Sequence, residues 1–443
     1  MGNYIPVTDA ERERMKKTVG IADVSEFFAG IPEEVLLEGS LNIPEGVSEL
    51  DVLRKFADIS RKNVVFRSVF RGAGIYDRYI PAIVEYVTAK EEFVTAYTPY
   101  QPEISQGVLQ SIFEYQTMIC ELTGMDVSNA SVYDGATAAA EAVAMCRERN
   151  RNTVVLSEGL HPQVLEVIET YCFGSGMKIV KVPLKHGRTD TGLLSHMLDE
   201  TVACVMIAQP NFLGQIEDAG VIGDMVHDAK VKFVMNCDPF SLAVLKTPAG
   251  YGADIAVGDG QSIGPAMSFG GPTFGYMACT SAMMRKLPGR IAGETVDTEG
   301  KRTFVLTLQA REQHIRREKA SSNICSNQAL CAMTAAVYLS SVGPEGLKTA
   351  ALSSISKAHY LKNKINGLKG FESPECGEFF NEFVTHSPVE PHLLCDRLAK
   401  RGILGGLPLK GELEGYILWC TTEKNTREHM DELVEVLREV CGL

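Results

Sequence analysis

The 443-residue sequence lacks the features that mark several classes of protein. Asp and Glu outnumber Lys and Arg, which gives a net charge of −13 at pH 7, and no basic run is long enough to follow a nucleic-acid backbone. No run reaches the roughly 20 apolar residues of a membrane span, and the opening MGNYIPVTDAERERM contains no apolar signal core. We therefore expect a cytoplasmic protein that has neither nucleic acid nor a membrane as its partner.

Patterns of metal and disulfide sites are also missing. The sequence has 12 cysteines but no CxxC pair, and its 9 histidines form no HExxH or other ligand pair. The cysteines are scattered singly through apolar runs, as reduced core thiols are. Examples are Cys120, Cys204, Cys237, Cys279 and Cys420. We expect neither a metal site nor a disulfide framework.

The residues that are present indicate an ordinary folded enzyme of two or three domains, since 45% of them are hydrophobic. Near the start, Thr8 and Glu11 form a capping box, and Val24–Phe28 begins a second short helical piece. This region has too few apolar residues per turn to form a core of its own. We expect residues 1–70 to be a helical arm that packs on a larger body or on a partner.

A βα rhythm follows. Short apolar runs alternate with roughly 20 to 30 residues of mostly helical pattern, and the runs lie at 154–156, 179–184, 203–208, 233–235, 255–257 and 276–279. This alternation predicts a large domain, residues 71–310, built on a parallel or mixed sheet covered by helices. Function in such a domain gathers at the carboxyl ends of the strands and at helix N-termini.

The last part of the chain, residues 311–443, predicts a smaller α/β domain. The elements we expect there are helices at 328–339 and 346–367, strands near 379–384 and 416–420, and a last helix capped by Asn425 with Glu428.

Two loops that precede the sheet, at 72–81 and 93–107, are dense in Tyr, Pro and Gly. Proline restricts φ and glycine permits close backbone approach, so these loops can hold phenol and amide groups in a set geometry. Tyr97 and Tyr100 are thus candidates for the wall of a binding site. The alternative is that both are half-buried aromatics of a turn. A helix at 104–124 follows, with Gly124 as its stop.

Gly135, Ala136 and Thr137 lead into an alanine-rich helix predicted at 138–149. Backbone N–H groups, a hydroxyl and the helix dipole converge there on a spot that suits a phosphate. The simpler interpretation is that Asp134 or Thr137 only caps the helix.

His161 and Asp238 complete a set of candidates. His161 follows a strand-end loop, where its ring could cover a planar cofactor, or it could be an ordinary loop or core residue. Asp238 ends a buried strand, the place from which a carboxylate pairs with a protonated pyridine nitrogen. A Gly-rich helix start, a histidine, a strand-end Asp and a further strand with a turn follow the layout of the aspartate-aminotransferase fold. The reactive lysine of that last turn is missing: no lysine lies between Lys246 and Lys286.

Five long stretches carry a family resemblance: GAGIYDRYIP (72–81), AYTPYQPEISQG (96–107), NASVYDGATAAAEA (129–142), SFGGP (268–272) and REKASSNICSNQAL (317–330). On these stretches the chain resembles, from Met1 to Leu443, the alpha subunit of the split glycine decarboxylase, the P-protein family of the glycine cleavage system. The resemblance implies an aspartate-aminotransferase-like fold with a large, doubly covered mixed sheet.

The resemblance also implies a reaction and partners. In that family a beta subunit is understood to carry the lysine and the pyridoxal phosphate, while the alpha subunit keeps a degenerate pocket and helps to build the active cleft. The α2β2 complex would remove CO2 from glycine and pass the aminomethyl group to the lipoyl arm of the H-protein. The alpha chain would be inactive alone.

Matched by position, the family pattern implies two sets of site residues. Tyr97, Tyr100 and Gln101 match the loop that reaches the cleft. The remnant of the cofactor pocket is matched by Gly135, Ala136, Thr137, His161 and Asp238. Arg78 departs from the pattern, because relatives usually have histidine there, and a permanent cation cannot take over a proton-handling role.

Two other functions stay open at this point. The chain could be a self-sufficient pyridoxal-phosphate decarboxylase or transaminase that uses a lysine outside the expected turn. It could also be a purely structural subunit. The absence of a lysine between Lys246 and Lys286 counts against a self-sufficient enzyme. The stiff tyrosine loops count against a purely structural subunit.

Overall fold

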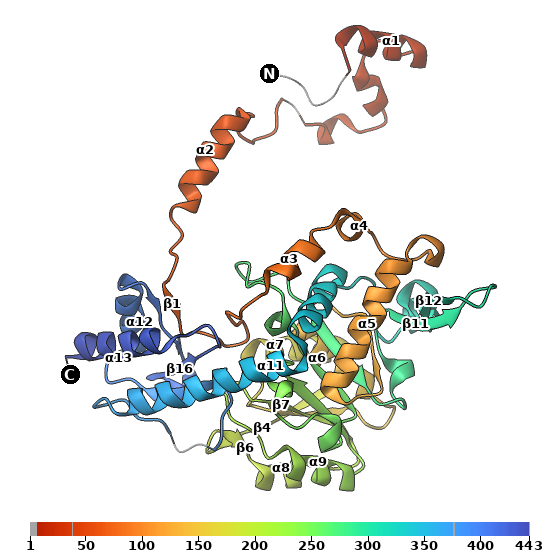
Figure 1. Cartoon of the computed structure of the whole chain (residues 1–443). Helices are drawn as coiled ribbons and strands as arrows, with labels where there is room; N and C mark the ends of the chain where they lie inside the picture. Colours follow the sequence, from red (N-terminus) through yellow and green to blue (C-terminus); the bar gives the residue numbers. More distant parts are fainter. Residues whose placement is uncertain (1–6, 38, 375–376, 443) are drawn as a thin grey trace. The chain divides into compact units, whose positions relative to one another are not determined.

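The computed structural model describes residues 7–37, 39–374 and 377–442 (Figure 1). The chain divides into two compact units, Met1–Val65 and Phe66–Leu443. The predicted division at residues 70 and 310 remains a prediction. Within the described ranges, no helix is both long enough and apolar enough to cross a membrane.

The first unit is a chain of short helices without a core. It contains α1 (Asp9–Val19), η1 (Val24–Phe28), η2 (Glu33–Val35) and α2 (Glu49–Ser60), and none of these elements has a buried residue. The predicted capping box is confirmed: Thr8 N–H donates to Glu11 Oε2 at 2.8 Å, and Glu11 N–H donates to Thr8 Oγ1 at 3.3 Å. Large apolar side chains such as Phe27 and Phe56 are exposed.

The second unit is organised around a seven-stranded sheet. In spatial order its strands are β2 (Val127–Ser128), β10 (Gly275–Cys279), β9 (Ile255–Asp259), β8 (Lys232–Cys237), β7 (Val202–Gln209), β3 (Thr153–Ser157) and β4 (Lys178–Val182). The five from β9 to β4 are parallel, while β10 runs antiparallel to both of its neighbours. The six predicted strands are confirmed, except that the run at 179–184 ends at Val182, and Leu184 belongs to the small hairpin of β5 (Leu184–Lys185) and β6 (Arg188–Thr189).

The sheet is covered on both faces, and its central strands β7, β8 and β9 are apolar over most of their length. Along β7, Val205 and Ile207 join a core with α5 (Gln106–Thr123), α9 (Ala219–Asp228) and α11 (Ala329–Asn366). The intervening Cys204 and Met206 join a second core with α6 (Gly135–Cys146) and α7 (Pro162–Ser175). Side chains alternate between the faces of a strand, so a continuous apolar run gives two cores.

Helix α6 begins and ends earlier than the sequence predicts. Its N-cap is Asp134, whose Oδ1 accepts a hydrogen bond from Thr137 N–H at 2.7 Å, so that the helix starts at Gly135. It ends at Cys146, because Arg147 has an extended ψ of 134°. The predicted end at residue 149 is wrong.

A smaller layer of strands and helices forms the C-terminal part. Strands β13 (Glu382–His386), β16 (Tyr416–Cys420) and β15 (Leu407–Pro408) are antiparallel and pack with α12 (Pro391–Lys400) and α13 (Arg427–Cys441) around Trp419. Strand β1 (Ser68–Val69) pairs with β14 (Ile403–Leu404). The two helices predicted at 328–339 and 346–367 are confirmed: both lie within the element labelled α11, which is broken by the non-helical backbone of Gly343 (φ 62°). The remaining elements are α3 (Ala82–Thr88), α4 (Glu91–Val94), α8 (Thr191–Met197), β11 (Ile291–Val296), β12 (Arg302–Thr307) and α10 (Gln313–Arg316).

One predicted cap is also wrong. The N-cap of α13 is Thr426, which forms a capping box with His429. The side chain of Asn425 is used elsewhere, since its Nδ2 donates to the carbonyl of Val69 at 2.9 Å. Adjacent Asn and Thr are both good N-caps, so the sequence alone does not decide between them.

Candidate functional site

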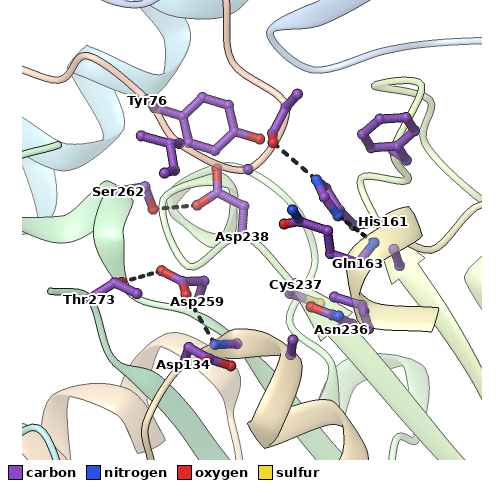
Figure 2. A pocket seen from close by; sticks show the side chains of 18 of the residues that line it. Tyr76, Asp134, His161, Gln163, Asn236, Cys237, Asp238, Asp259, Ser262 and Thr273 are labelled. Atoms are coloured by element: carbon purple, nitrogen blue, oxygen red, sulfur yellow. Dashed lines mark hydrogen bonds between the residues drawn. The ribbon is translucent and has the colours of Figure 1, made fainter. Parts of the chain in front are cut away.

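A cavity of about 610 Å³ opens at the carboxyl ends of β3, β7, β8 and β9. Figure 2 shows the start of α6, His161 and Asp238 around it, with Tyr76 from the loop after β1. Gly135 and Ala136 line it as well, whereas Thr137 does not. The fold therefore brings together most of the residues that match the family's remnant pocket.

The N-terminus of α6 already holds carboxylates of this chain. Gly135 N–H donates to Asp259 Oδ2 at 3.0 Å (Figure 2), and Thr137 N–H donates to Asp134 Oδ1. Asp259 also accepts from Gln261 N–H at 2.9 Å and from the Thr273 hydroxyl. The position predicted to bind a phosphate, at the N-terminus of α6, is therefore occupied by the Asp259 side chain.

Asp238 directly follows β8 and is hydrogen-bonded by residues of two turns. Its Oδ1 accepts from Phe240 N–H at 3.1 Å and from the Ser262 hydroxyl. Its Oδ2 has no hydrogen-bond partner and lies 3.9 Å from Arg78 Nη2. Burial raises the pKa of Asp238, and the Arg78 charge and the Ser262 hydroxyl oppose that rise.

Arg78 is buried next to this carboxylate. Its Nη1 donates to Ser354 Oγ and to Glu423 Oε2, both at 3.0 Å. Its guanidinium carbon lies 3.7 Å from the centroid of the Phe240 ring, a cation–π contact. Arg78 therefore supplies a permanent positive charge beside Asp238, where a pyridoxal cofactor would bring its protonated ring nitrogen.

The turn that follows β9 shows what replaces the missing lysine. The side chain of Gln261 accepts from Tyr76 N–H at 2.8 Å and donates to the carbonyls of Tyr76 at 3.0 Å and Pro265 at 3.1 Å. It ties the loop that contains Tyr76 to the sheet, while its neighbour Ser262 bonds Asp238. With no amine at the turn and a carboxylate at the helix start, the residues do not fit covalently bound pyridoxal phosphate.

His161 is held at both ring nitrogens. Nδ1 accepts from Gln163 N–H at 3.1 Å, so the proton of the neutral ring is on Nε2, which donates to the carbonyl of Ala73 at 3.1 Å. Burial lowers the pKa of this imidazole. The ring lies 4.9 Å from that of Phe212 in an edge-to-face arrangement. The histidine is therefore a fixed, neutral wall of the cavity.

The tyrosine loop lies apart from this cavity. Tyr97, Tyr100 and Gln101 are all exposed, and none of them lines it. Tyr97 is 85% exposed, whereas the Tyr100 hydroxyl accepts from Arg290 Nη2 at 3.1 Å. The two sets of predicted site residues are therefore separate within this chain.

Asp259 and Glu382 are among the acidic residues of the cavity that the sequence analysis does not identify. Asp259 lies two residues beyond the predicted strand at 255–257, so the strand-end rule could have found it. Glu382 comes from β13 and accepts from Ala73 N–H at 2.7 Å and from the Tyr76 hydroxyl at 2.8 Å. Burial raises its pKa to about 7. Nothing in the sequence near Glu382 signals this role.

Comparisons with known proteins identify a family and close relatives of the chain. The family model described as "Glycine cleavage system P-protein" matches residues 2–437. The chain is 49% identical over 440 residues to "Probable glycine dehydrogenase (decarboxylating) subunit 1" of Carboxydothermus hydrogenoformans, covering 98% of this chain and 99% of the relative. It is 46% identical over 443 residues to the protein of the same name from Moorella thermoacetica, with 99% and 100% covered.

Solved structures point the same way. A crystal structure of glycine decarboxylase (P-protein) of the glycine cleavage system in inhibitor-bound form superposes with a TM-score of 0.93 at 44% identity, covering 99% of this chain and 100% of that one. A sphingosine-1-phosphate lyase from Burkholderia pseudomallei has a TM-score of 0.67 at 13% identity, covering 93% and 95%. The second similarity concerns the fold alone. The predicted aspartate-aminotransferase-like fold is confirmed.

Proposed function

The chain belongs to the glycine cleavage system P-protein family, and from this premise we propose that it is the subunit of a two-chain glycine decarboxylase that leaves the cofactor to its partner. The observation that carries the proposal is the turn after β9, where Gln261 and Ser262 stand in place of a lysine and are hydrogen-bonded within the chain. The name subunit 1 of its relatives supports a second chain.

On this proposal, pyridoxal phosphate is bound by the beta subunit. The cofactor supplies there the electron sink for the loss of CO2 from glycine. Gly135, Ala136, Thr137, His161 and Asp238 are the remnant of a cofactor pocket in this chain. The hydrogen bonds of Gly135, Thr137, His161 and Asp238 to neighbouring side chains and backbone support a role in holding the fold together.

We further propose that the loop with Tyr97, Tyr100 and Gln101 completes the active cleft in trans. The loop is stiffened by Pro99 and Pro102, and the helix α5 follows it directly. Phenol and amide groups held in this way can hydrogen-bond the carboxylate of glycine or a docking lipoyl arm without first ordering a loop.

The remaining partners follow from the same reaction. The acceptor of the aminomethyl group is the lipoylated H-protein, the complex is α2β2, and its location is cytoplasmic. The core-free first unit supports a protein partner, because its exposed apolar side chains need another surface for burial.

Co-expression with the beta subunit tests the proposal. We expect the purified chain alone to have no glycine–bicarbonate exchange activity and the complex to have it. After borohydride reduction and peptide mapping, a pyridoxyl group should be found on a lysine of the beta subunit. A pyridoxyl group on any lysine of this chain, or activity of this chain alone, would contradict the assignment.

A further inference from the structure

The N-terminus of α6 is where a fold of this type would place a phosphate, because helix N-termini present unpaired N–H groups and a positive dipole end. In this chain those groups face carboxylates instead. Asp259 Oδ2 accepts from Gly135 N–H at 3.0 Å (Figure 2), and the Asp134 carboxylate accepts from Thr137 N–H at 2.7 Å. A carboxyl group of the protein already occupies the helix end. Burial raises the pKa of Asp259, and its hydrogen bonds with Thr273, Gly135 and Gln261 oppose that rise.

The Asp259 carboxylate has the hydrogen bonds that a bound phosphate oxygen would need. Besides Gly135 N–H it receives Gln261 N–H at 2.9 Å and the Thr273 hydroxyl. These donors come from the start of α6, from the turn after β9 and from the segment before β10. The Asp259 side chain therefore links these three segments by hydrogen bonds, as a bound phosphate could.

Asp259 occupies the space next to Gly135 at the helix end itself, although the cavity opens beside it. A Cβ added to Gly135 would lie 2.7 Å from both Asp259 N and Asp259 Cβ, so the helix start rests directly on the end of β9. Behind it, a Cβ on Gly260 would lie 1.9 Å from the Phe274 ring. A phosphate at this place would also meet a like charge, which disfavours binding.

We propose that Asp259 is a built-in substitute for the cofactor phosphate, which closes the α6 N-terminus and so prevents this chain from competing with its partner for pyridoxal phosphate. The proposal rests on the proposed function only for the identity of the competing ligand. The residues that carry it are Asp259, its three donors and the close contact with Gly135.

Removal of the carboxylate should convert the closed helix end into an anion site. In the full chain, Asp259→Ala is expected to lower the melting temperature, and inorganic phosphate should restore it by roughly 5 °C relative to chloride at equal ionic strength. Calorimetric titration should give one phosphate per chain. Pyridoxal 5′-phosphate should bind this variant more tightly than pyridoxal, because only the first has the anion.

Two matched variants keep the test decisive. Asp259→Ser also makes room and retains an oxygen beside Gln261 N–H, so it should show the same phosphate effect if Asp259→Ala does not fold. Glu390 is a comparable carboxylate at a helix N-terminus, accepting from His392 N–H and Leu393 N–H, but it is not part of the cavity. Glu390→Ala should lose stability without phosphate-specific recovery.

The proposal is overturned if phosphate stabilises the wild-type chain as much as the variants, or if neither Asp259 variant responds to it. Neither result bears on the proposed function, because decarboxylation is measured with the beta subunit present. Conversely, an inactive complex would leave the phosphate effect of the Asp259 variants unchanged.

Discussion

Arg78 lies against the carboxylates of Asp238 and Glu423, with its guanidinium stacked on the Phe240 ring. Removing one partner of a buried ion pair leaves the charge of the remaining partner uncompensated. Such a loss typically destabilises a protein by about 3–5 kcal/mol. We expect Arg78→Ala to lower the free energy of unfolding by this amount in urea denaturation at pH 7. The loss should shrink in acid, because protonated carboxylates need no counter-ion.

The control for this prediction is Arg302, whose pair with Glu294 is exposed. Surface pairs contribute about 0–1 kcal/mol, so Arg302→Ala should change stability little at either pH. If Arg78→Ala and Arg302→Ala behave alike, the buried network around Asp238 does not stabilise the fold.

Glu141 is a buried carboxyl group that should make the stability of the chain depend on pH. It is 2% exposed in α6, and burial raises its pKa to about 7, opposed by hydrogen bonds with Ser322 and Tyr171. Because the folded state holds the proton more tightly than the unfolded state, stability falls as pH rises from the unfolded pKa, near 4.5, to about 7. Glu141→Gln should match the wild type at pH 4 and be more stable at pH 8, by up to about 3 kcal/mol.

Denaturation curves measured across this pH range test whether the pKa of Glu141 is raised in the folded protein. Parallel stability profiles for Glu141→Gln and the wild type would show that Glu141 titrates normally. The same substitution at the exposed Glu166 of α7, Glu166→Gln, serves as the control.

Some site residues are predictable from the sequence and others are not, for physical reasons. His161 and Asp238 follow apolar runs, and the ends of parallel strands meet at one edge of the sheet, so their proximity was predictable. Glu382 and Arg78 reach the same region from distant parts of the chain through tertiary packing. No local pattern reports such contacts.

At the scale of elements, the loop before α5 carries the main catalytic proposal. Tyr97→Phe and Tyr100→Phe keep the rings and remove the hydroxyls. If these hydroxyls act in the cleft, each variant should assemble normally while kcat/KM of the complex falls about 10- to 100-fold. If they serve only the loop, stability should fall instead and the kinetics should remain.

The two tyrosines are not equivalent, because Tyr100 accepts a hydrogen bond from Arg290 whereas Tyr97 is 85% exposed. Tyr97→Phe is therefore the cleaner test. Tyr86, an exposed tyrosine of α3, serves as the control, and Tyr86→Phe should leave exchange activity unchanged. Full activity of both Tyr97→Phe and Tyr100→Phe would remove the case for catalysis by these hydroxyls.

Elements differ in how well the sequence predicts them. Most of the strands are predictable because each contains a short run of consecutive apolar residues, as a strand covered on both faces requires. The ends of helices are harder to predict. The non-helical Gly343, with φ 62°, separates two helical segments as the sequence predicts, whereas α6 starts at Gly135 because Asp134 caps it. A residue type only favours such a cap, and the backbone geometry decides whether it forms.

In the whole molecule, the second unit has apolar cores, whereas the described residues of the first unit, 7–37 and 39–65, form none. The unit Phe66–Leu443 contains apolar cores on both sheet faces and a third around Trp419. The helices of Met1–Val65 bury no residue. A segment that buries nothing gains little from folding alone, so its apolar residues indicate a role in assembly.

Removal of residues 1–65 tests that role. Because the helices of this segment bury no residue, the shortened chain should keep the melting temperature of the full chain. It should lose most of its binding to the beta subunit, since stable subunit interfaces commonly bury more than about 2,000 Å² with a large apolar share. Within α2, Val52, Phe56 and Ile59 share one exposed face. Phe56→Asp should weaken assembly, whereas Asp58→Ala, on the other face, should not. Co-purification and sedimentation of each variant with the beta subunit provide the measurement, and unchanged assembly of the shortened chain would exclude the first unit from the interface.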